Sequence, residues 1–262
     1  MIPKIVHYCW FGKKKKPKLV RDCINSWKRH LVDYEIIEWN EENIDLIHPF
    51  VQQAYKLKKW AFVADYVRFK VLYEYGGIYL DTDMILLKSL NDFRFNECFF
   101  GAEESEIISC GIIGTHKNND FIKDCLVIYD TLEIYEGLNL VKIVVTRMIT
   151  DLFRIKYEFY DLFDKIVNKS NIVIYPSTIF YPFPFHKKYD IKNYSDYIVK
   201  DSYAVHLWSN SWIIQNEFNS LRKGEYLKGF KIVMNNFFSG NTNLKYWQKV
   251  LSSVNQSLLR NE

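Results

Sequence analysis

The chain has 262 residues, of which 25% are charged and 48% hydrophobic, and a net charge of +4. So small a positive excess does not favour nucleic acid as a partner. No apolar run is long enough to predict a transmembrane helix, and the N-terminus lacks the apolar core of a signal peptide. The five cysteines show no CxxC spacing, which is typical of reduced thiols in a cytoplasmic protein.

The first 40 residues predict a strand, a helix and a second strand. Residues 5–10 are a short β-branched and aromatic run, residues 19–31 repeat apolar side chains at helical spacing, and residues 34–39 return to strand character. This order of elements is typical of a βαβ unit and a parallel sheet.

A strong helical pattern follows over residues 51–75, with a break expected near Lys58. Gly76-Gly77 ends the helix, because glycine adopts the left-handed cap conformation at little cost. Later strands are expected over residues 78–80, 98–102, 107–115, 172–175 and 203–208, and later helices over residues 121–135 and 140–153. Residues 84–87 are a further apolar run.

From residue 213 onward the pattern is polar and helical, and Gly224, Gly229 and Gly240 are expected to break it. The alternation of strands and helices before that point predicts a three-layered α/β fold. We therefore expect a catalytic domain over residues 1–212 and a C-terminal helical extension, residues 213–262, packed on it.

Two carboxylates, Asp81 and Asp83, follow the strand expected after the double glycine. Because strand side chains alternate, both are expected on one face. Two such ligands in an open site suit Mn²⁺ or Mg²⁺, which bind there together with substrate phosphates. The ion neutralises the diphosphate that leaves a nucleotide-sugar donor. An isolated DxD is more often a turn with two solvated acids.

The helix before this strand carries a second charged group. Asp65 and Arg68 are three residues apart and therefore share one helical face. One interpretation is a surface ion pair, worth about 0–1 kcal/mol. The other is a donor site, in which Asp65 binds hydroxyl groups and Arg68 binds diphosphate or sugar oxygens.

The segments WAFVADYVR, residues 60–68, and LYEYGGIYLDTD, residues 72–83, resemble the DxD sugar-binding signature of glycosyltransferase family 32. That family includes bacterial capsular-polysaccharide transferases and yeast mannosyltransferases, and the block is similar to the catalytic domain of the large clostridial glucosylating toxins. The resemblance implies a GT-A type Rossmann-like nucleotide-sugar-binding fold, a divalent ion and retention at the anomeric carbon. It places the following residues at the donor: Trp60, Asp65, Arg68, Tyr79 and Asp81.

The segment HYCWFG, residues 7–12, extends the resemblance to the N-terminus. It is similar to the first strand of these enzymes, which implies that Trp10 stacks on the donor base and that the backbone of Cys9 binds the edge of the base. A Trp10 side chain buried in the core is the alternative.

The segment HLWSNSW, residues 206–212, is similar to the C-terminal element of the family. The similarity implies that His206 completes the metal shell of Asp81 and Asp83, and that Ser211 and Trp212 lie on a loop over the diphosphate. Ser109 and Cys110 stand where such enzymes often carry Asn or another polar group near the sugar, so the donor sugar stays undefined.

The sequence thus predicts a retaining, metal-dependent hexosyltransferase that moves a sugar from a UDP- or GDP-sugar to a glycan acceptor. The expected acceptor is lipid-linked, in bacterial capsular or surface polysaccharide synthesis. The expected location is cytoplasmic and peripheral at the inner face of the membrane. Residues 13–16 and the C-terminal helices are candidate lipid contacts. The alternatives are a solvated loop for residues 13–16 and packing of the helices on the catalytic domain. Two other hypotheses stay open: a metal-dependent phosphoryl or nucleotidyl transferase, and a non-catalytic sugar-binding module.

Overall fold

The computed structural model of the protein describes residues 1–135, 138, 143–188, 190–209, 217–222, 224–239 and 242–258. The chain divides into two compact units, Met1–Ser209 and Asn210–Glu262. Within the described ranges, no helix has both the length and the apolar character needed to cross a bilayer.

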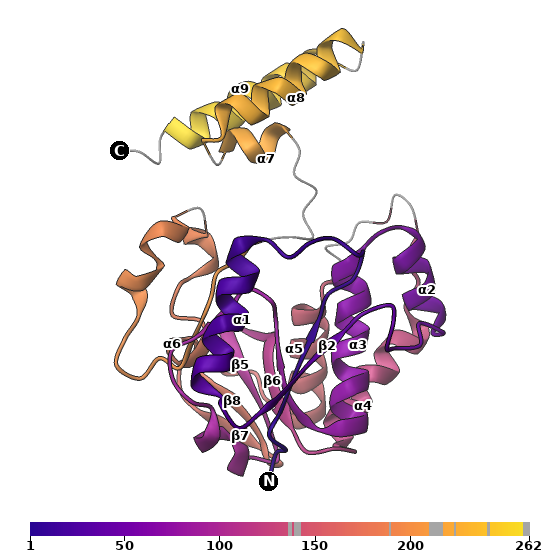
Figure 1. The fold of residues 1–262 in the computed structure, drawn as a ribbon, viewed down its shortest axis with the longest axis vertical. Helices are drawn as coiled ribbons and strands as arrows, with labels where there is room; N and C mark the ends of the chain where they lie inside the picture. Colours follow the sequence, from indigo (N-terminus) through magenta and orange to yellow (C-terminus); the bar gives the residue numbers. More distant parts are fainter. Residues whose placement is uncertain are drawn as a thin grey trace. The chain divides into compact units, whose positions relative to one another are not determined.

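The first unit is organised around a seven-stranded sheet with the order β2-β1-β3-β6-β5-β8-β7 (Figure 1). β1 pairs in parallel with β2 and β3, and β5 with β8, whereas the other neighbours are antiparallel. Its strands are β1 (Ile5–Cys9), β2 (Glu35–Trp39), β3 (Gly77–Leu80), β5 (Cys98–Glu104), β6 (Ile107–Thr115), β7 (Val167–Lys169) and β8 (Ile172–Tyr175). A separate antiparallel pair joins β4 (Met84–Leu86) to β9 (Ala204–His206).

Helices cover both faces of this sheet, which confirms the predicted three-layered α/β fold. Tyr79 of β3 belongs to one apolar cluster, together with helices α2, α3, α4 and α5, whereas Ile78 and Leu80 belong to a second, which includes α1. The helices of this unit are α1 (Lys18–His30), α2 (Pro49–Lys56), α3 (Trp60–Tyr75), α4 (Asp120–Val127), α5 (Val145–Tyr157) and α6 (Ser177–Phe180). Short 3₁₀ helices span Asn91–Phe95, Ile128–Thr131, Phe185–Lys187 and Ile191–Tyr197.

The turn from α3 into β3 is where glycine is required. Gly76 and Gly77 have φ angles of 67° and 104°, which other residues rarely adopt. A Cβ atom on Gly77 would also lie 2.7 Å from the carbonyl oxygen of Ile5. The predicted helix stop is confirmed, and so is the break near Lys58, whose own φ is 56° and which separates α2 from α3.

Some boundaries differ from the sequence pattern. The helix expected over residues 121–135 leaves α geometry at Val127 and continues as a 3₁₀ helix to Thr131. The sequence pattern also missed β7, a three-residue strand that pairs antiparallel with β8. Such short segments carry too few residues for a periodic signal, and tertiary packing decides their conformation.

The second unit is a small helical assembly of α7 (Glu217–Arg222), α8 (Tyr226–Phe238) and α9 (Leu244–Leu258) around a core that includes Leu221, Val233 and Val250. Gly229, expected to break a helix, lies inside α8 instead. A Cβ atom there would lie 2.7 Å from Cγ of Leu221, so this glycine lets α7 approach α8 closely. Gly224 does lie at a turn, with φ of 74°, and Gly240 lies outside the described residues. That residues 213–262 pack on the first unit stays a prediction.

Candidate active site

Asp81 and Asp83 lie in a tight turn between β3 and β4. β3 ends at Leu80, and the backbone N–H of Met84 donates to the carbonyl oxygen of Asp81 at 3.0 Å. The expectation that strand alternation places both acids on one face is therefore wrong. The turn brings the carboxylates together, and it leads into β4, where Met84 pairs directly with His206 of β9.

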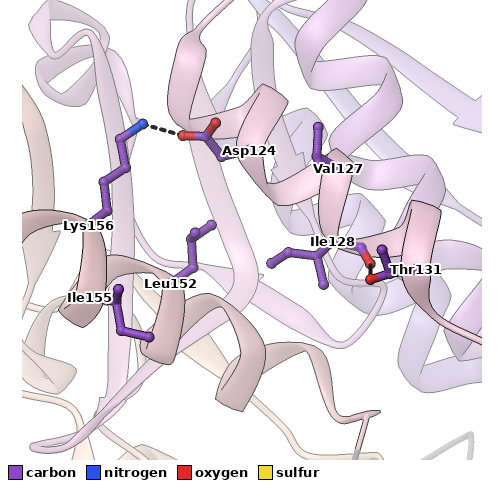
Figure 2. Close-up of a pocket in the computed structure, with 7 residues that line it drawn as sticks. All are labelled: Asp124, Val127, Ile128, Thr131, Leu152, Ile155 and Lys156. Atoms are coloured by element: carbon purple, nitrogen blue, oxygen red, sulfur yellow. Dashed lines mark hydrogen bonds and ion pairs between the residues drawn. The ribbon is translucent and has the colours of Figure 1, made fainter.

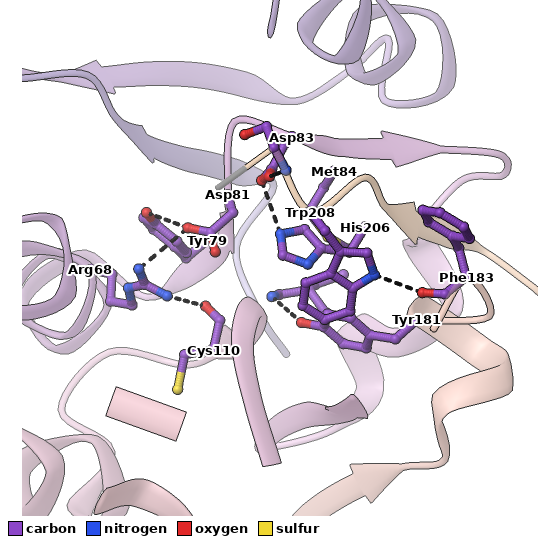
Figure 3. A network of polar contacts seen from close by, with 12 residues as sticks. Arg68, Tyr79, Asp81, Asp83, Met84, Cys110, Tyr181, Phe183, His206 and Trp208 are labelled. Carbon is purple, nitrogen blue, oxygen red and sulfur yellow. Dashed lines mark hydrogen bonds and ion pairs between the residues drawn. The ribbon is translucent and has the colours of Figure 1, made fainter. Parts of the chain in front are cut away.

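Ligand atoms of Asp81, Asp83 and His206 lie within 4.8 Å of one another (Figure 3). Nε2 of His206 is 2.9 Å from Oδ1 of Asp83, and the backbone N–H of Ser209 donates to Oδ2 of Asp83 at 2.8 Å. Nδ1 of His206 is buried and has no hydrogen-bond partner in the described part of the chain. Two carboxylates and an imidazole with an unused nitrogen fit a divalent ion such as Mn²⁺.

Asp83 and His206 each stabilise the charged form of the other. Burial by itself would raise the pKa of Asp83, but the charge of His206 and the hydrogen bonds from His206 and Ser209 lower it well below its usual range. Burial opposes protonation of His206, yet Asp83 raises the pKa of its imidazole. The site thus favours an ionised Asp83, which is the form that binds a cation.

Asp65 and Arg68 of α3 are only 8% and 5% exposed, so they are not a surface ion pair. The guanidinium of Arg68 donates to Oδ1 of Asp65 at 2.7 Å and to the carbonyl oxygen of Cys110 at 2.5 Å. It also lies 3.3 Å from Oδ1 of Asp81 and 4.7 Å from the centre of the Tyr79 ring (Figure 3). Arg68 therefore connects α3 and β6 to the turn that carries the acids.

Tyr79 completes this connection, because its hydroxyl donates to Oδ1 of Asp81 at 3.0 Å. Burial raises the pKa of Asp65 to about 6; the charge of Arg68 opposes this shift and that of Asp81 adds to it. The carboxylates of Asp65 and Asp81 therefore both lie against one buried guanidinium, that of Arg68. This crowding of like charges is typical of functional sites, where a bound cation or substrate relieves it.

The residues expected at the donor base lie where β1 ends and α3 begins. Trp10 is half-buried, its indole N–H donates to the carbonyl oxygen of Lys14 at 2.6 Å, and Nζ of Lys16 is 5.8 Å from its ring centre. A Cβ atom on Gly12 would lie 2.8 Å from the Trp60 ring. The fold thus brings the loop after Trp10 against Trp60, whereas the roles of both side chains at a base stay predictions.

Two further donor contacts were expected, one from Cys9 and one from Ser211 and Trp212. Cys9 is buried, and burial raises the pKa of its thiol far above the usual range, so it is an inert thiol. Its backbone belongs to β1, where it pairs with Trp39 of β2. Ser211 and Trp212 lie outside the described residues.

The sequence analysis missed two polar side chains near the acids, Glu103 and Tyr181. Tyr181 is buried, its hydroxyl accepts from the backbone N–H of Ile112 at 2.9 Å, and its ring centre is 5.7 Å from that of His206. Burial raises the pKa of Glu103 to about 7, against the opposing charge of His206 and a hydrogen bond with Ser109. The segment Glu103-Glu104-Ser105 is typical of an exposed hairpin end, so the sequence carried no signal for a half-buried acid.

A surface hollow lies elsewhere, between α4 and α5 (Figure 2). An ion pair between Asp124 and Lys156 closes one side. Its lining residues are Asp124, Val127, Ile128, Thr131, Leu152, Ile155 and Lys156. None of them is a candidate donor or metal residue, so this hollow does not bear on the site described above.

Comparison with known proteins identifies the region around the two acids. Residues 17–100 match the family model described as "Glycosyltransferase sugar-binding region containing DXD motif". An uncharacterised glycosyltransferase of Acanthamoeba polyphaga mimivirus is 30% identical over 130 residues, covering 45% of this chain and 52% of that protein. Inositol phosphoceramide mannosyltransferase 3 of Schizosaccharomyces pombe is 30% identical over 129 residues, covering 46% of this chain and 35% of that protein.

Among solved structures, the PaToxG glycosyltransferase superimposes with a TM-score of 0.50 at 19% identity, over 60% of this chain and 70% of that one. At this identity the likeness concerns the fold alone. The chain spans about half the length of the mimivirus relative and about a third of the yeast relative.

Proposed function

We propose that this chain, which belongs to the glycosyltransferases with a DXD-containing sugar-binding region and has a GT-A type fold, transfers a sugar from a nucleoside diphosphate donor to a glycan acceptor. The observation that carries the proposal is the convergence of Asp81, Asp83 and His206 at the end of β3, beside the buried Arg68. Carboxylates and an imidazole at the edge of an α/β sheet suit a metal-bound diphosphate.

The proposed division of labour follows from the contacts. Asp81, Asp83 and His206 would hold a divalent ion, Mn²⁺ or Mg²⁺, which would supply positive charge against the leaving diphosphate. Arg68 holds Asp65 and Asp81 in their positions. Trp10 and Trp60 are proposed to frame the base, and Ser211 and Trp212 to contact the diphosphate.

We propose a retaining reaction and a lipid-linked acceptor in surface polysaccharide synthesis, such as capsule, at the cytoplasmic face of the membrane. Retention rests on the family resemblance of residues 60–83. The lipid-linked acceptor has support in the S. pombe relative, whose name states that it mannosylates inositol phosphoceramide. NMR of the first-formed product decides the stereochemistry: an inverted anomer would break the link to this mechanism.

The two other hypotheses fit the geometry less well. A phosphoryl or nucleotidyl transferase with two ions needs further acids that are free to bind metal, but Asp65 is already paired with Arg68 at 2.7 Å. A non-catalytic sugar-binding module has no need for three metal ligands that converge within 4.8 Å.

Thermal shift with Mn²⁺ and a panel of nucleotides tests the proposal, followed by donor hydrolysis over UDP- and GDP-sugars. A nucleoside diphosphate at about 100 times its Kd stabilises a binding-competent protein by about 2.7 kcal/mol through mass action. We expect this stabilisation to need the metal. Stabilisation by a nucleoside triphosphate alone, with phosphoryl transfer, would favour the second hypothesis.

Asp83→Asn is the matching variant, because it keeps the shape of the side chain and removes the charge that binds the ion. We expect it to lose most donor hydrolysis and the metal-dependent thermal shift while it stays folded. Asp92→Asn is the control, since Asp92 is an exposed acid bonded to Tyr203 in the same unit. Full activity of Asp83→Asn, or of the wild type in chelator, would remove the metal from the mechanism.

A further inference from the structure

We propose that Glu41 is a positioning residue for the nucleotide: its carboxylate holds the loop after β1 in the conformation that forms one wall of the base site. This inference rests on the proposed function, because it takes the nucleoside end of the donor to lie against this loop. The loop, residues 10–17, joins β1 to α1, and Glu41 follows β2 two residues after its end.

The topology of the sheet favours a ligand site at the carboxyl end of β1. β1 lies between β2 and β3 and is parallel to both, so all three strands end at the same edge. The chain leaves β1 through α1 to reach β2 on one side, and then passes through α2 and α3 to β3 on the other side. In α/β sheets, ligands bind outside the carboxyl ends of strands where the connections diverge in this way. Asp81 and Asp83 follow β3, so the loop after β1 is the neighbouring part of this edge.

The backbone of this loop is strained at its centre. Gly12 and Lys13 have φ angles of 88° and 55°, so the chain turns sharply through two consecutive residues with positive φ. Lysine rarely adopts such an angle, and strain of this kind persists only where the surrounding structure holds it. Across the same turn, the indole N–H of Trp10 donates to the carbonyl oxygen of Lys14 at 2.6 Å. The position of the Trp10 side chain therefore depends on the conformation of the turn.

Glu41 holds the turn from outside the loop. One oxygen, Oε1, accepts from the backbone N–H of Gly12 at 2.7 Å and from the hydroxyl of Tyr55 on α2 at 3.0 Å. Burial by itself would raise the pKa of this carboxyl, but the hydrogen bonds that it accepts lower the pKa, so the ionised acid makes both bonds. A second anchor lies at the end of the loop, where Nζ of Lys16 is 2.6 Å from Oε2 of Glu38.

The contacts of Glu41 also join the turn to Trp60, the other candidate residue at the base. A Cβ atom on Gly12 would lie 2.8 Å from Cε2 and Nε1 of Trp60, so the turn packs directly on this indole. The ring of Tyr55 meets Trp60 edge to face, with 5.0 Å between the ring centres. Without the Glu41 carboxylate the strained turn would lose this support, and Trp10 its fixed position. The effect should therefore concern the base rather than the metal-bound diphosphate.

The test compares Glu41→Ala with wild type and with Glu42→Ala, which removes an exposed neighbouring acid. Calorimetry in Mn²⁺ measures affinity for UDP, GDP and inorganic pyrophosphate, and donor hydrolysis gives KM and kcat. We expect Glu41→Ala to bind the preferred nucleoside diphosphate about 10-fold less tightly, the low end of the range for a hydrogen bond to a charged group. Its pyrophosphate affinity and kcat should match wild type while KM rises, because a loosened base site weakens substrate and transition state equally. Glu42→Ala should change none of these values.

Glu41→Gln distinguishes positioning from a direct effect of charge. Glutamine keeps a carbonyl oxygen that can accept from Gly12 and Tyr55, so this variant should recover most of the affinity that Glu41→Ala loses. A loss in Glu41→Gln as large as that in Glu41→Ala would contradict the positioning role.

Two further results would overturn the proposal. One is an unchanged affinity of Glu41→Ala for both nucleoside diphosphates, and the other is an equal loss for pyrophosphate, since the effect would then not concern the base. If Glu41→Ala does not fold, Tyr55→Phe takes its place, because it removes one of the two hydrogen bonds and keeps the ring. It should show a smaller loss of the same kind, and no loss would again overturn the proposal. If wild type binds neither UDP nor GDP in Mn²⁺, the proposed function itself fails.

Discussion

At the residue scale, two ion pairs of the same helix differ in how deeply they are buried. Asp65 and Arg68 of α3 are buried, whereas Lys70 and Glu74 form an i,i+4 pair with side chains 29% and 41% exposed. A buried pair that loses one partner leaves an uncompensated charge, which costs about 3–5 kcal/mol. An exposed pair contributes about 0–1 kcal/mol.

Arg68→Lys is therefore expected to behave as a severe change. A lysine ammonium lacks the planar fork that contacts Asp65, Asp81 and the Cys110 carbonyl together. We expect a loss of a few kcal/mol in the free energy of unfolding, measured by urea denaturation, and a loss of most donor hydrolysis. Lys70→Ala is the control and should stay within about 1 kcal/mol of wild type. Wild-type turnover in Arg68→Lys would reduce Arg68 to a structural residue.

At the scale of elements, the α3–β3 turn determines where the acids lie. β3 has four residues between Gly76 and Asp81, so a shift at its start displaces the DXD turn. Gly77 is held on one side by Ile5 of β1, whose carbonyl oxygen leaves no room for a Cβ atom, and by His7, whose Nε2 would lie 3.0 Å from it. The turn is thus part of the active-site framework as well as a helix stop.

Gly77→Ala tests this coupling. We expect it to destabilise the protein by about 1–3 kcal/mol from its φ of 104° alone, with a further loss from the contact with Ile5, and to reduce metal-dependent nucleotide binding. Gly224→Ala is the control: its φ is 74°, but the nearest atom to an added Cβ, Oγ of Ser257, is 3.5 Å away. That variant should show a smaller loss of stability and normal nucleotide binding.

At the scale of the whole molecule, charge is divided unevenly between the two units. Residues 210–262 contain seven Lys and Arg and three acids, which accounts for the whole net charge of +4 and leaves residues 1–209 balanced. α8 also exposes an apolar stripe: Leu227, Phe230, Met234, Phe237 and Phe238. A basic, amphipathic helical unit is suited to the surface of an anionic bilayer, where the proposed lipid-linked acceptor would lie.

Two truncated chains test whether the helical unit is needed for membrane binding, for catalysis or for both. Residues 1–216 without the helices should keep donor hydrolysis and lose co-sedimentation with phosphatidylglycerol vesicles, whereas full-length protein binds these and binds neutral vesicles less. Residues 1–209, which also lack Ser211 and Trp212, should hydrolyse the donor more slowly. Equal vesicle binding by the 1–216 chain would contradict the membrane role, and loss of its nucleotide binding would make the helices part of the catalytic unit.

Local patterns in the sequence determined much of this protein. The helix over residues 60–75, its glycine stop, the short strand and the two acids are read from periodicity and residue type, because each depends on neighbours in the chain. The same holds for the α/β class, which follows from the order of strands and helices. The family resemblance of residues 60–83 added the DXD chemistry.

Only the tertiary structure decided what depends on distant contacts. It placed Asp81 and Asp83 in a turn rather than on a strand face, buried the Asp65–Arg68 pair, and set Gly229 inside a helix against Leu221. It also shifted the register between β5 and β6, so that Glu103 has no partner along that pair. Burial and strand register depend on which segments pack or pair across the fold. Such long-range contacts leave no periodic signal in the residues that make them.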